Sequence, residues 1–258
     1  MLSIATINTW KCEGDYLKRL SILVKELELM KIQIILVQEA FQSVNEKYNT
    51  SRFLSKHLGF SYVSTQSRLK KRMFDHGNLE SYSNVSIISQ FPIMNWYIVP
   101  LPSGPEDGGR DAIVAEILVN NKILLFISVH LSHLRNGESL RKQQFLHILN
   151  QDFMQKAYDG IFIGGDFNTP LNESFLDELT NHHFRYDDTF IYRKKLDGID
   201  YTFSFKNKFR KIDHIVQISK IHKPMLEIID SEIIMSEKDS ESGTLASDHY
   251  GVMTLINV

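Results

Sequence analysis

Short apolar runs recur along the whole chain, and each is followed by polar or turn-forming residues. Runs of this length, rich in β-branched and aromatic residues, predict buried strands. The expected strands are residues 2–8, 32–37, 60–65, 85–88, 96–99, 112–119, 122–130, 161–163, 201–205, 212–218, 225–234 and 252–258. The runs on either side of Asn120-Asn121 should form a hairpin, and those on either side of Phe91-Pro92 should also pair.

Apolar residues at three- and four-residue spacing predict helices between some of these strands. Leucines follow this spacing after Asp15, a suitable N-cap, and the pattern continues to Met30. Further helices are expected at residues 51–58, 139–156 and 172–179. Gly59 is a good stop for the first of these, and Asn172 is a suitable cap for the last.

Many strands with helices inserted between them predict packed sheets flanked by helices, an α/β (α+β) fold. The sequence shows no fixed-period repeat, low-complexity tract or linker, so residues 1–258 are expected to form a single domain.

Composition narrows the choice of function. The hydrophobic fraction, 43%, is ordinary for a globular protein. The formal net charge is -2, so the chain is not expected to coat nucleic acid through bulk charge. A nuclease with a locally basic cleft is still compatible with this charge. Cys12 is the only cysteine, which excludes an intramolecular disulfide and a zinc site with several cysteine ligands. Without a signal peptide or an apolar run of about 18 residues, a cytoplasmic protein is expected.

The run at 161–163 leads into Gly164-Gly165-Asp166-Phe167-Asn168. The glycines allow a close turn, and an acid and an amide two residues apart share one face of an extended chain. Oxygen ligands of this kind suit Mg²⁺ or Mn²⁺. A strand that ends in an ordinary polar turn is the alternative interpretation.

Other predicted strands also end in polar side chains that can bind metal or transfer protons. These residues are Asn8, Glu39, His130, Asp166, Asn168, Asp213, Asp248 and His249. Strand ends in layered α/β proteins are where ligands bind. Taken singly, Glu39 could be a solvated strand end and His130 a core histidine. Asp213 lies in an apolar run and needs a partner if buried, for which a histidine is suitable.

Several cations could meet an anionic substrate. Residues 68–72 hold four cations in five positions, as a solvated loop or helix face or as a lip at a binding site. Arg110 follows a glycine pair and could reach a phosphate oxygen, as could His133. A surface arginine and a plain loop histidine are the alternatives.

The same polar residues carry a resemblance that covers nearly the whole chain. In order, the motifs are Thr6-Ile7-Asn8-Thr9-Trp10, Val37-Gln38-Glu39, Asn84-Val85-Ser86-Ile87-Ile88-Ser89 with Phe91-Pro92-Ile93, Ser128-Val129-His130-Leu131, Gly165-Asp166-Phe167-Asn168, Lys211-Ile212-Asp213-His214 and Ser247-Asp248-His249. They resemble those of the endonuclease/exonuclease/phosphatase superfamily, which includes DNase I-like nucleases, neutral sphingomyelinases and inositol polyphosphate 5-phosphatases. The resemblance implies a four-layered α/β sandwich, with two mixed β-sheets packed face to face and helices outside. It also implies Mg²⁺-dependent hydrolysis of a phosphate ester.

The resemblance also implies a metal site. Glu39 resembles the family's main metal ligand, with Asn8 beside it, and Asp248 resembles a further acid at that site. Mg²⁺ is the expected ion, and Mn²⁺ would suit the same ligands.

The resemblance assigns catalytic roles to the other residues. His249 resembles the general base that takes a proton from the attacking water, and Asp213 the acid that orients this histidine. Asp166 resembles the residue that positions the water or a second metal. Asn168 would donate to the phosphate, and His130 would contact the phosphate and assist the leaving group.

One position departs from a branch of the family. Abasic-site endonucleases have an acid two residues after the first Asn, where this chain has Trp10. The departure favours a phosphodiesterase that acts on a lipid headgroup or another small phosphodiester. A nuclease acting on DNA or RNA is the alternative, and an inactive binding module on the same fold is a third. The substrate is expected to be a phosphodiester or phosphomonoester, and the protein a monomer with no stable protein partner.

Overall fold

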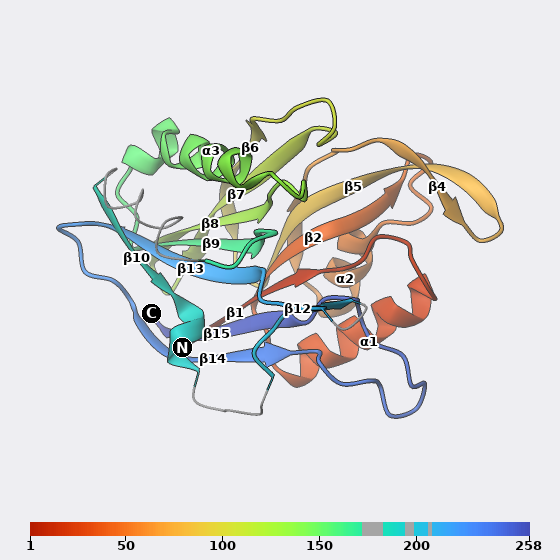
Figure 1. Ribbon diagram of the computed structural model, residues 1–258. Helices are drawn as coiled ribbons and strands as arrows, with labels where there is room; N and C mark the ends of the chain where they lie inside the picture. Colours follow the sequence, from red (N-terminus) through yellow and green to blue (C-terminus); the bar gives the residue numbers. More distant parts are fainter. Residues whose placement is uncertain (172–182, 194–198, 206–207) are drawn as a thin grey trace.

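The computed structural model describes residues 1–171, 183–193, 199–205 and 208–258. The helix expected at 172–179 lies outside these residues. Two large sheets dominate the described part of the chain (Figure 1).

The first sheet has seven strands in the order β14-β15-β1-β2-β5-β3, with β4 also paired to β5. Its strands are β1 (Leu2–Asn8), β2 (Ile34–Ser43), β3 (Ser61–Ser64), β4 (Lys70–Phe74), β5 (Gly77–Ser89), β14 (Glu227–Ile234) and β15 (Gly251–Asn257). Strands β1 and β2 are parallel and the other pairs are antiparallel, so the sheet is mixed.

The second sheet has six strands in the order β10-β13-β9-β8-β7-β6. Its strands are β6 (Ile93–Leu101), β7 (Arg110–Val119), β8 (Lys122–His130), β9 (Gly160–Asp166), β10 (Phe184–Asp188) and β13 (Asp213–Lys220). Here β8 and β9 form the parallel pair. A separate two-stranded ribbon joins β11 (Phe203–Phe205) to β12 (Lys208–Arg210).

Helices cover the outer faces of both sheets (Figure 1). They are α1 (Tyr16–Leu29), α2 (Thr50–Leu58) and α3 (Glu138–Leu149), with 3₁₀ turns η1 (Asp152–Gln155) and η2 (Thr189–Tyr192). Helices α1 and α2 pack on the first sheet and α3 on the second. A third apolar cluster fills the space between the sheets, where the rings of Phe126 and Phe162 stack 5.5 Å apart. The four-layered sandwich predicted from the sequence is therefore confirmed.

Local signals in the sequence explain several element boundaries. Asp15 caps α1 by accepting a hydrogen bond from Lys18 N, and Gly59 ends α2 in the left-handed conformation. Asn120 and Asn121 both have positive φ, at 49° and 62°, as a tight hairpin turn between β7 and β8 requires. These three expectations are confirmed.

The expected pairing across Phe91-Pro92 is wrong. Strand β5 pairs with β2, β3 and β4, whereas β6 pairs with β7 in the other sheet. The chain turns at Ser89, whose hydroxyl bonds both N and O of Phe91, and Pro92 O already accepts from Leu118 N of β7. The connection therefore passes from one sheet to the other instead of closing a hairpin.

Two other expectations also need correction. Residues 70–72 form part of strand β4, paired with β5, and are neither a solvated loop nor a helix face. The helix expected at 139–156 is shorter, because α3 ends at Leu149 and a 3₁₀ turn follows. Polar Asn150-Gln151-Asp152 interrupt the apolar face there. No helix among the described residues has the length and apolar character needed to cross a membrane.

Glu116 in β7 gives a stability prediction. Its buried carboxylate accepts hydrogen bonds from Lys156 Nζ (2.8 Å), Asn95 Nδ2 (2.7 Å) and Tyr158 OH (2.7 Å). Burial raises the pKa of Glu116, but these hydrogen bonds overcome it and bring the pKa down from 4.5 to about 2. Because the folded-state pKa is the lower one, the stabilisation is complete above pH 4.5 and is lost as the pH falls toward 2.

We therefore expect Glu116→Gln to destabilise the protein at pH 7 by about 1–3 kcal/mol, the range for hydrogen bonds to a charged group. The difference from the native chain should shrink as the pH falls from 5 to 3. Melting temperatures of the variant and the native chain, measured at pH 5 and at pH 3, check this expectation. A constant difference in melting temperature across that range would contradict it.

Candidate active site

Polar residues from both sheets meet where several strands end. The first sheet contributes Asn8 at the end of β1, Glu39 within β2, and Asp248 and His249 just before β15. The second contributes His130 at the end of β8, Asp166 at the end of β9 and Asp213 at the start of β13. Asp166 and Asp213 are direct register partners, so the paired strands β9 and β13 bring them together (Figure 1).

His249 and Asp213 form a buried pair across the two sheets. His249 Nδ1 lies 2.8 Å from Asp213 Oδ2, and the ring packs on that of Phe203 at 4.7 Å. Burial alone lowers the pKa of His249, but the charge and hydrogen bond of Asp213, with Asp166 and Asp248, raise it to about 10. With Nδ1 held by the carboxylate, Nε2 is the nitrogen available for proton transfer.

Asp166 is the most connected acid of the site. Its Oδ2 accepts a hydrogen bond from Asn8 Nδ2 at 3.1 Å and lies 3.4 Å from His130 Nε2 and 3.9 Å from His249 Nε2. Burial and the negative charge of Asp213 raise its pKa to about 7, against the opposing effects of His249 and the Asn168 amide. A cation bound nearby would stabilise the ionised form of Asp166 and so lower this pKa.

A set of ligand atoms suited to a cation is present. One carboxylate oxygen each from Asp166 and Asp213 and a ring nitrogen of His249 all lie within 4.8 Å of one another. Burial and the charge of Glu39 raise the pKa of Asp248, although His249 and Lys11 oppose this. Oxygen-rich sites of this type suit hard divalent cations.

Glu39 is placed by an irregularity in β2. The β2–β5 register shifts between Val37 and Ala40, and Glu39 has φ 54° at this bulge. Its Oε1 pairs with Lys11 Nζ at 2.7 Å. Bulges commonly redirect a side chain next to a site, and here the redirected carboxylate meets a cationic group of the protein itself.

Arg19 in α1 organises the two loops that carry Asn8 and Asp248, and sequence reasoning missed it. Only 1% of Arg19 is exposed. Its guanidinium donates to five backbone oxygens, those of Thr9, Trp10, Lys11, Glu13 and Ala246. Arg19 lies three residues after Tyr16 and four before Leu23, both buried, so a cation on the apolar face of α1 was the available signal.

Further hydrogen bonds fix the loop before β15. Ser247 Oγ donates to Asn8 O at 2.6 Å, and His249 N donates to Ser247 Oγ at 3.3 Å.

The start of β13 is fixed by a hydroxyl group, because Asp213 N and Ile212 N both donate to Thr202 Oγ1. His214, the sequence neighbour of Asp213, points to the other face of β13 and packs on Phe167.

The buried side chain of Arg110 is hydrogen-bonded to the backbone of His130. Nε donates to Asp107 Oδ1 at 2.9 Å, Nη1 donates to His130 O at 2.8 Å, and Nη2 lies 2.6 Å from His133 Nδ1. Asn168 is similarly engaged, because its Nδ2 donates to Leu131 O at 3.1 Å. The expectation that Arg110, His133 and Asn168 contact a phosphate stays a prediction, and the contacts observed are structural.

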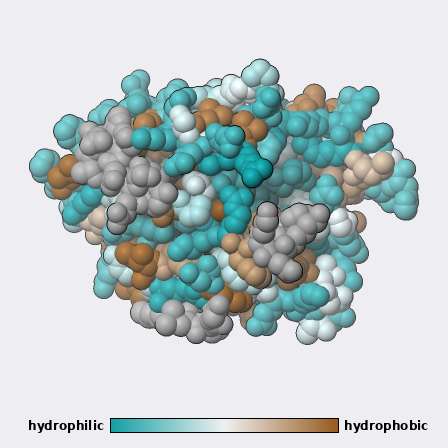
Figure 2. Space-filling view, viewed as in Figure 1, coloured by the Kyte–Doolittle hydropathy of each residue, from teal (hydrophilic) through white to brown (hydrophobic). Residues whose placement is uncertain are grey.

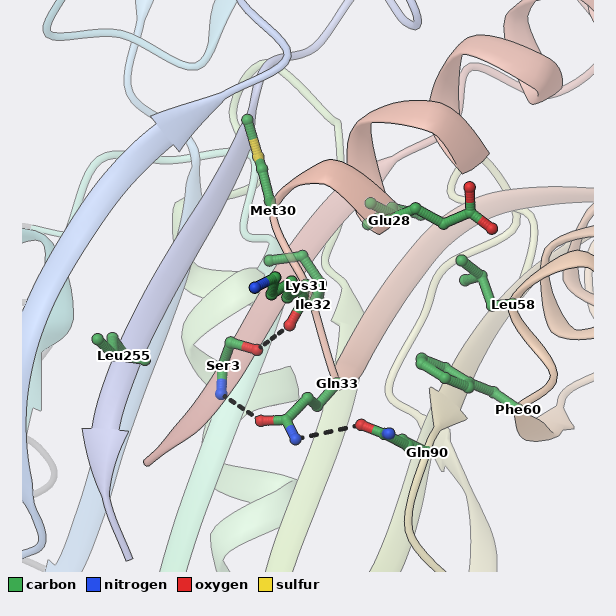
Figure 3. Close-up of a pocket in the computed structure, with 11 residues that line it drawn as sticks. Ser3, Glu28, Met30, Lys31, Ile32, Gln33, Leu58, Phe60, Gln90 and Leu255 are labelled. Carbon is green, nitrogen blue, oxygen red and sulfur yellow. Dashed lines mark hydrogen bonds between the residues drawn. The ribbon is translucent and has the colours of Figure 1, made fainter.

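One pocket among the described residues lies away from this site. It has a volume of about 660 Å³ and is lined by Ser3, Met30, Gln33, Leu58 and Phe60, among others (Figure 3). Ser3 is near the start of β1, at the opposite end of the strand from Asn8. Hydrophilic residues cover most of the visible face of the molecule, with hydrophobic residues in separate patches (Figure 2).

Comparisons with known proteins bear on the family and the fold of the chain. The model of the Endonuclease/Exonuclease/phosphatase family matches residues 5–249. A search of curated protein sequences found no match.

Solved structures share the fold at low sequence identity. An endonuclease/exonuclease/phosphatase family protein from Leptotrichia buccalis is 19% identical with a TM-score of 0.76, and the match covers 100% of both chains. TDP2 from D. rerio, in complex with a single-strand DNA product, is 18% identical with a TM-score of 0.75 and covers 100% of this chain and 99% of its own. A mannosyl-6-phosphatase from Bacteroides thetaiotaomicron is 16% identical with a TM-score of 0.72 over 100% of both chains.

Proposed function

This chain belongs to the endonuclease/exonuclease/phosphatase family, and we propose that it hydrolyses a small phosphate ester with the aid of Mg²⁺ or Mn²⁺. The observation that supports this most is the buried pair of His249 and Asp213. The Nε2 atom of His249 lies 3.9 Å from Asp166 Oδ2. A histidine held by one carboxylate and directed toward a second, at a site with further acids, is suited to water activation.

In the proposed reaction, His249 Nε2 accepts a proton from water as the water oxygen attacks phosphorus. The bond from phosphorus to the leaving oxygen breaks on the opposite side. Asp213 holds Nδ1–H of the ring and stabilises the imidazolium that forms. Asp166 accepts a hydrogen bond from the attacking water and so orients it.

The proposed cation ligands are Glu39 and Asp248, with Asn8 beside them. Asp213 is already engaged by His249 Nδ1, and Asp166 and His249 Nε2 are assigned to the attacking water. When bound, the cation would offset the negative charge of the phosphate and of the surrounding carboxylates. Those carboxylates raise the pKa of His249, so their neutralisation moves that pKa back toward the range where Nε2 can accept a proton.

His130 would act as a neutral donor to the phosphate. Burial, with the positive charges of Arg110 and Arg68, holds the pKa of His130 well below its usual value. The ring is therefore uncharged at neutral pH and has one N–H, which can donate a hydrogen bond to a phosphate oxygen.

Removal of the cation tests the proposal. We expect the purified protein to hydrolyse bis-p-nitrophenyl phosphate or p-nitrophenyl phosphate in Mg²⁺ or Mn²⁺, with release of p-nitrophenolate as the readout. Excess EDTA should abolish the release, and excess Mg²⁺ should restore it. Undiminished hydrolysis in EDTA, or none in either cation, would contradict the proposal and favour an inactive binding module.

A nuclease is the second candidate, because the D. rerio TDP2 structure of the same fold holds a DNA product. Fold similarity at 18% identity does not carry the substrate over, so the two candidates need a direct comparison. Single-stranded and duplex oligonucleotides should be tested under the conditions used for the p-nitrophenyl esters. Cleavage of oligonucleotides in preference to the small esters would favour the nuclease.

A further inference from the structure

Three cations next to the β4–β5 hairpin are not used by the proposed reaction. They are Arg68, just before β4, and Lys70 and Arg72 within β4, named here the hairpin cluster. Lys70 and Arg72 share a face of the strand, because alternate residues of an extended chain do so. Lys70 and Arg72 lie within β4, opposite Ser81 and Leu79 of β5. Lys70 is exposed, as are Leu69 and Lys71, whereas Arg68 and Arg72 are half-buried.

The side chain of Arg72 in the hairpin cluster is held in a fixed arrangement. Arg72 Nη1 donates to both O and Oγ of Ser81, and its Nη2 donates to Arg68 O at 3.1 Å. Arg68 itself has a left-handed backbone, with φ 57°. These hydrogen bonds fix the side chain of Arg72 against Ser81 and the backbone of Arg68.

The hairpin cluster lies beside the His130 end of the active site. Arg68, Arg110 and His130 line the same small cavity, together with Ser67, Ser83, Val85 and Asp111. Lys70 Nζ lies near Gly108, 3.8 Å from the position that a Cβ on this glycine would take. Gly108 precedes Arg110 by two residues, so the cluster and the loop that leads into Arg110 face each other.

The cations of this cluster lack ion-pair partners among the described residues. Among the described residues, none of Arg68, Lys70 and Arg72 forms an ion pair, and Arg68 Nε is buried without a hydrogen-bond partner. Repulsion from Arg68, with burial and the charge of Arg72, lowers the pKa of Lys70.

Two of the carboxylates close to the cluster have cationic partners of their own, and a third, Asp111, has a neutral one. Asp107 pairs with Arg110, and Glu39 pairs with Lys11. Asp111 accepts a hydrogen bond from Ser67 Oγ. Several cations without acidic partners, around an unsatisfied guanidinium nitrogen, favour binding of an anion with several oxygens.

We propose that the hairpin cluster binds a second phosphate group of the substrate, while the phosphate to be hydrolysed lies next to His130 and His249. This inference rests on the proposed function and narrows its substrate to small molecules that carry two phosphate groups. The three cations come from five consecutive residues, a span that suits one phosphate better than the backbone of a nucleic acid, which needs a longer basic track.

Binding measurements test the cluster separately from catalysis. The probes are adenosine 3′,5′-bisphosphate and fructose 1,6-bisphosphate, compared by calorimetry with adenosine 5′-monophosphate and fructose 6-phosphate. Measurements in Mg²⁺ and in EDTA are both needed. We expect at least one bisphosphate to bind about tenfold more tightly than its monophosphate, since one additional charged hydrogen bond contributes about 1.5 kcal/mol or more.

The double variant Arg68→Met/Lys70→Met should lose this preference. The matched control, Lys71→Met/Lys56→Met, removes the same charge from exposed positions outside the cluster and should keep it. Equal affinity for bisphosphates and monophosphates in the native chain would overturn the inference, as would loss of the preference in the control. Tighter binding of a single-stranded oligonucleotide, lost in the cluster variant, would assign the cluster to nucleic acid and overturn the small-molecule substrate.

The two proposals can fail separately. A bisphosphate preference that depends on Arg68 and Lys70, without hydrolysis of any ester, would keep the subsite and reject the enzyme. Cation-dependent hydrolysis without that preference would keep the enzyme and reject the subsite.

Discussion

Replacing His249 by alanine should lower kcat for phosphoester hydrolysis by about 10²–10⁴-fold, the usual contribution of a general base. The variant still has the proposed cation ligands, so KM should change much less than kcat. Initial rates of p-nitrophenolate release from bis-p-nitrophenyl phosphate in saturating Mg²⁺ measure both constants. Circular dichroism and thermal unfolding show whether the variant is folded.

Two further variants show whether the loss is specific. His57→Ala removes an exposed histidine of α2 and should leave kcat unchanged. Asp213→Asn retains the size of the side chain but removes the charge that faces His249 Nδ1, so it should also lower kcat. If His249→Ala folds and retains more than about a tenth of the native kcat, which is well above the range for a general base, His249 is not the base.

Glu39→Gln should weaken binding of the divalent cation. A ligand that binds only the folded state at 100 times its Kd stabilises that state by about 2.7 kcal/mol. The native protein should therefore show a rise in melting temperature as Mg²⁺ or Mn²⁺ is added, and the variant should require much more cation for the same rise. Its hydrolysis rate should fall in parallel at low cation concentration.

The matched control is Glu46→Gln, which changes an exposed acid in the loop that follows β2. This variant should show the same cation-dependent rise as the native chain. A full rise in Glu39→Gln at native cation concentrations would show that Glu39 is not a ligand. Direct calorimetric titration with Mn²⁺ gives the same comparison without relying on activity.

Much of the fold could be predicted because its signals are local. Buried strands appear in the sequence as apolar runs, and Asn120-Asn121, both with positive φ, specify a tight two-residue hairpin turn. The pairing across Phe91-Pro92 failed because adjacency along the chain favours a hairpin, whereas burial of both sheets required the chain to cross between them. Only long-range packing decides between these outcomes.

Residues of the site were predictable by type, and so was one of their contacts. The motif resemblance implied that Asp213 orients His249, and the structure places Asp213 Oδ2 2.8 Å from His249 Nδ1. It gave no indication that Arg19 would hold two loops through backbone carbonyls, because such bonds leave no pattern in the side chains of the partners. It also did not predict that Arg110 would be engaged by Asp107 and His130 O, a consequence of how the loop before β7 folds.

Two hydrogen bonds of the site, His249 to Asp213 and Asn8 to Asp166, each join a residue of one sheet to a residue of the other. The proposed cation ligands belong to the first sheet, whereas Asp166 and Asp213 belong to the second. These two hydrogen bonds therefore set the position of the cation relative to the residues proposed to hold the water and orient His249. Coupling of this kind is reciprocal, so a change that weakens the packing between the two sheets should also weaken binding of the cation. Phe126 and Phe162, which stack between the sheets and precede His130 and Asp166 by four residues on β8 and β9, would then affect catalysis through the alignment of the two sheets.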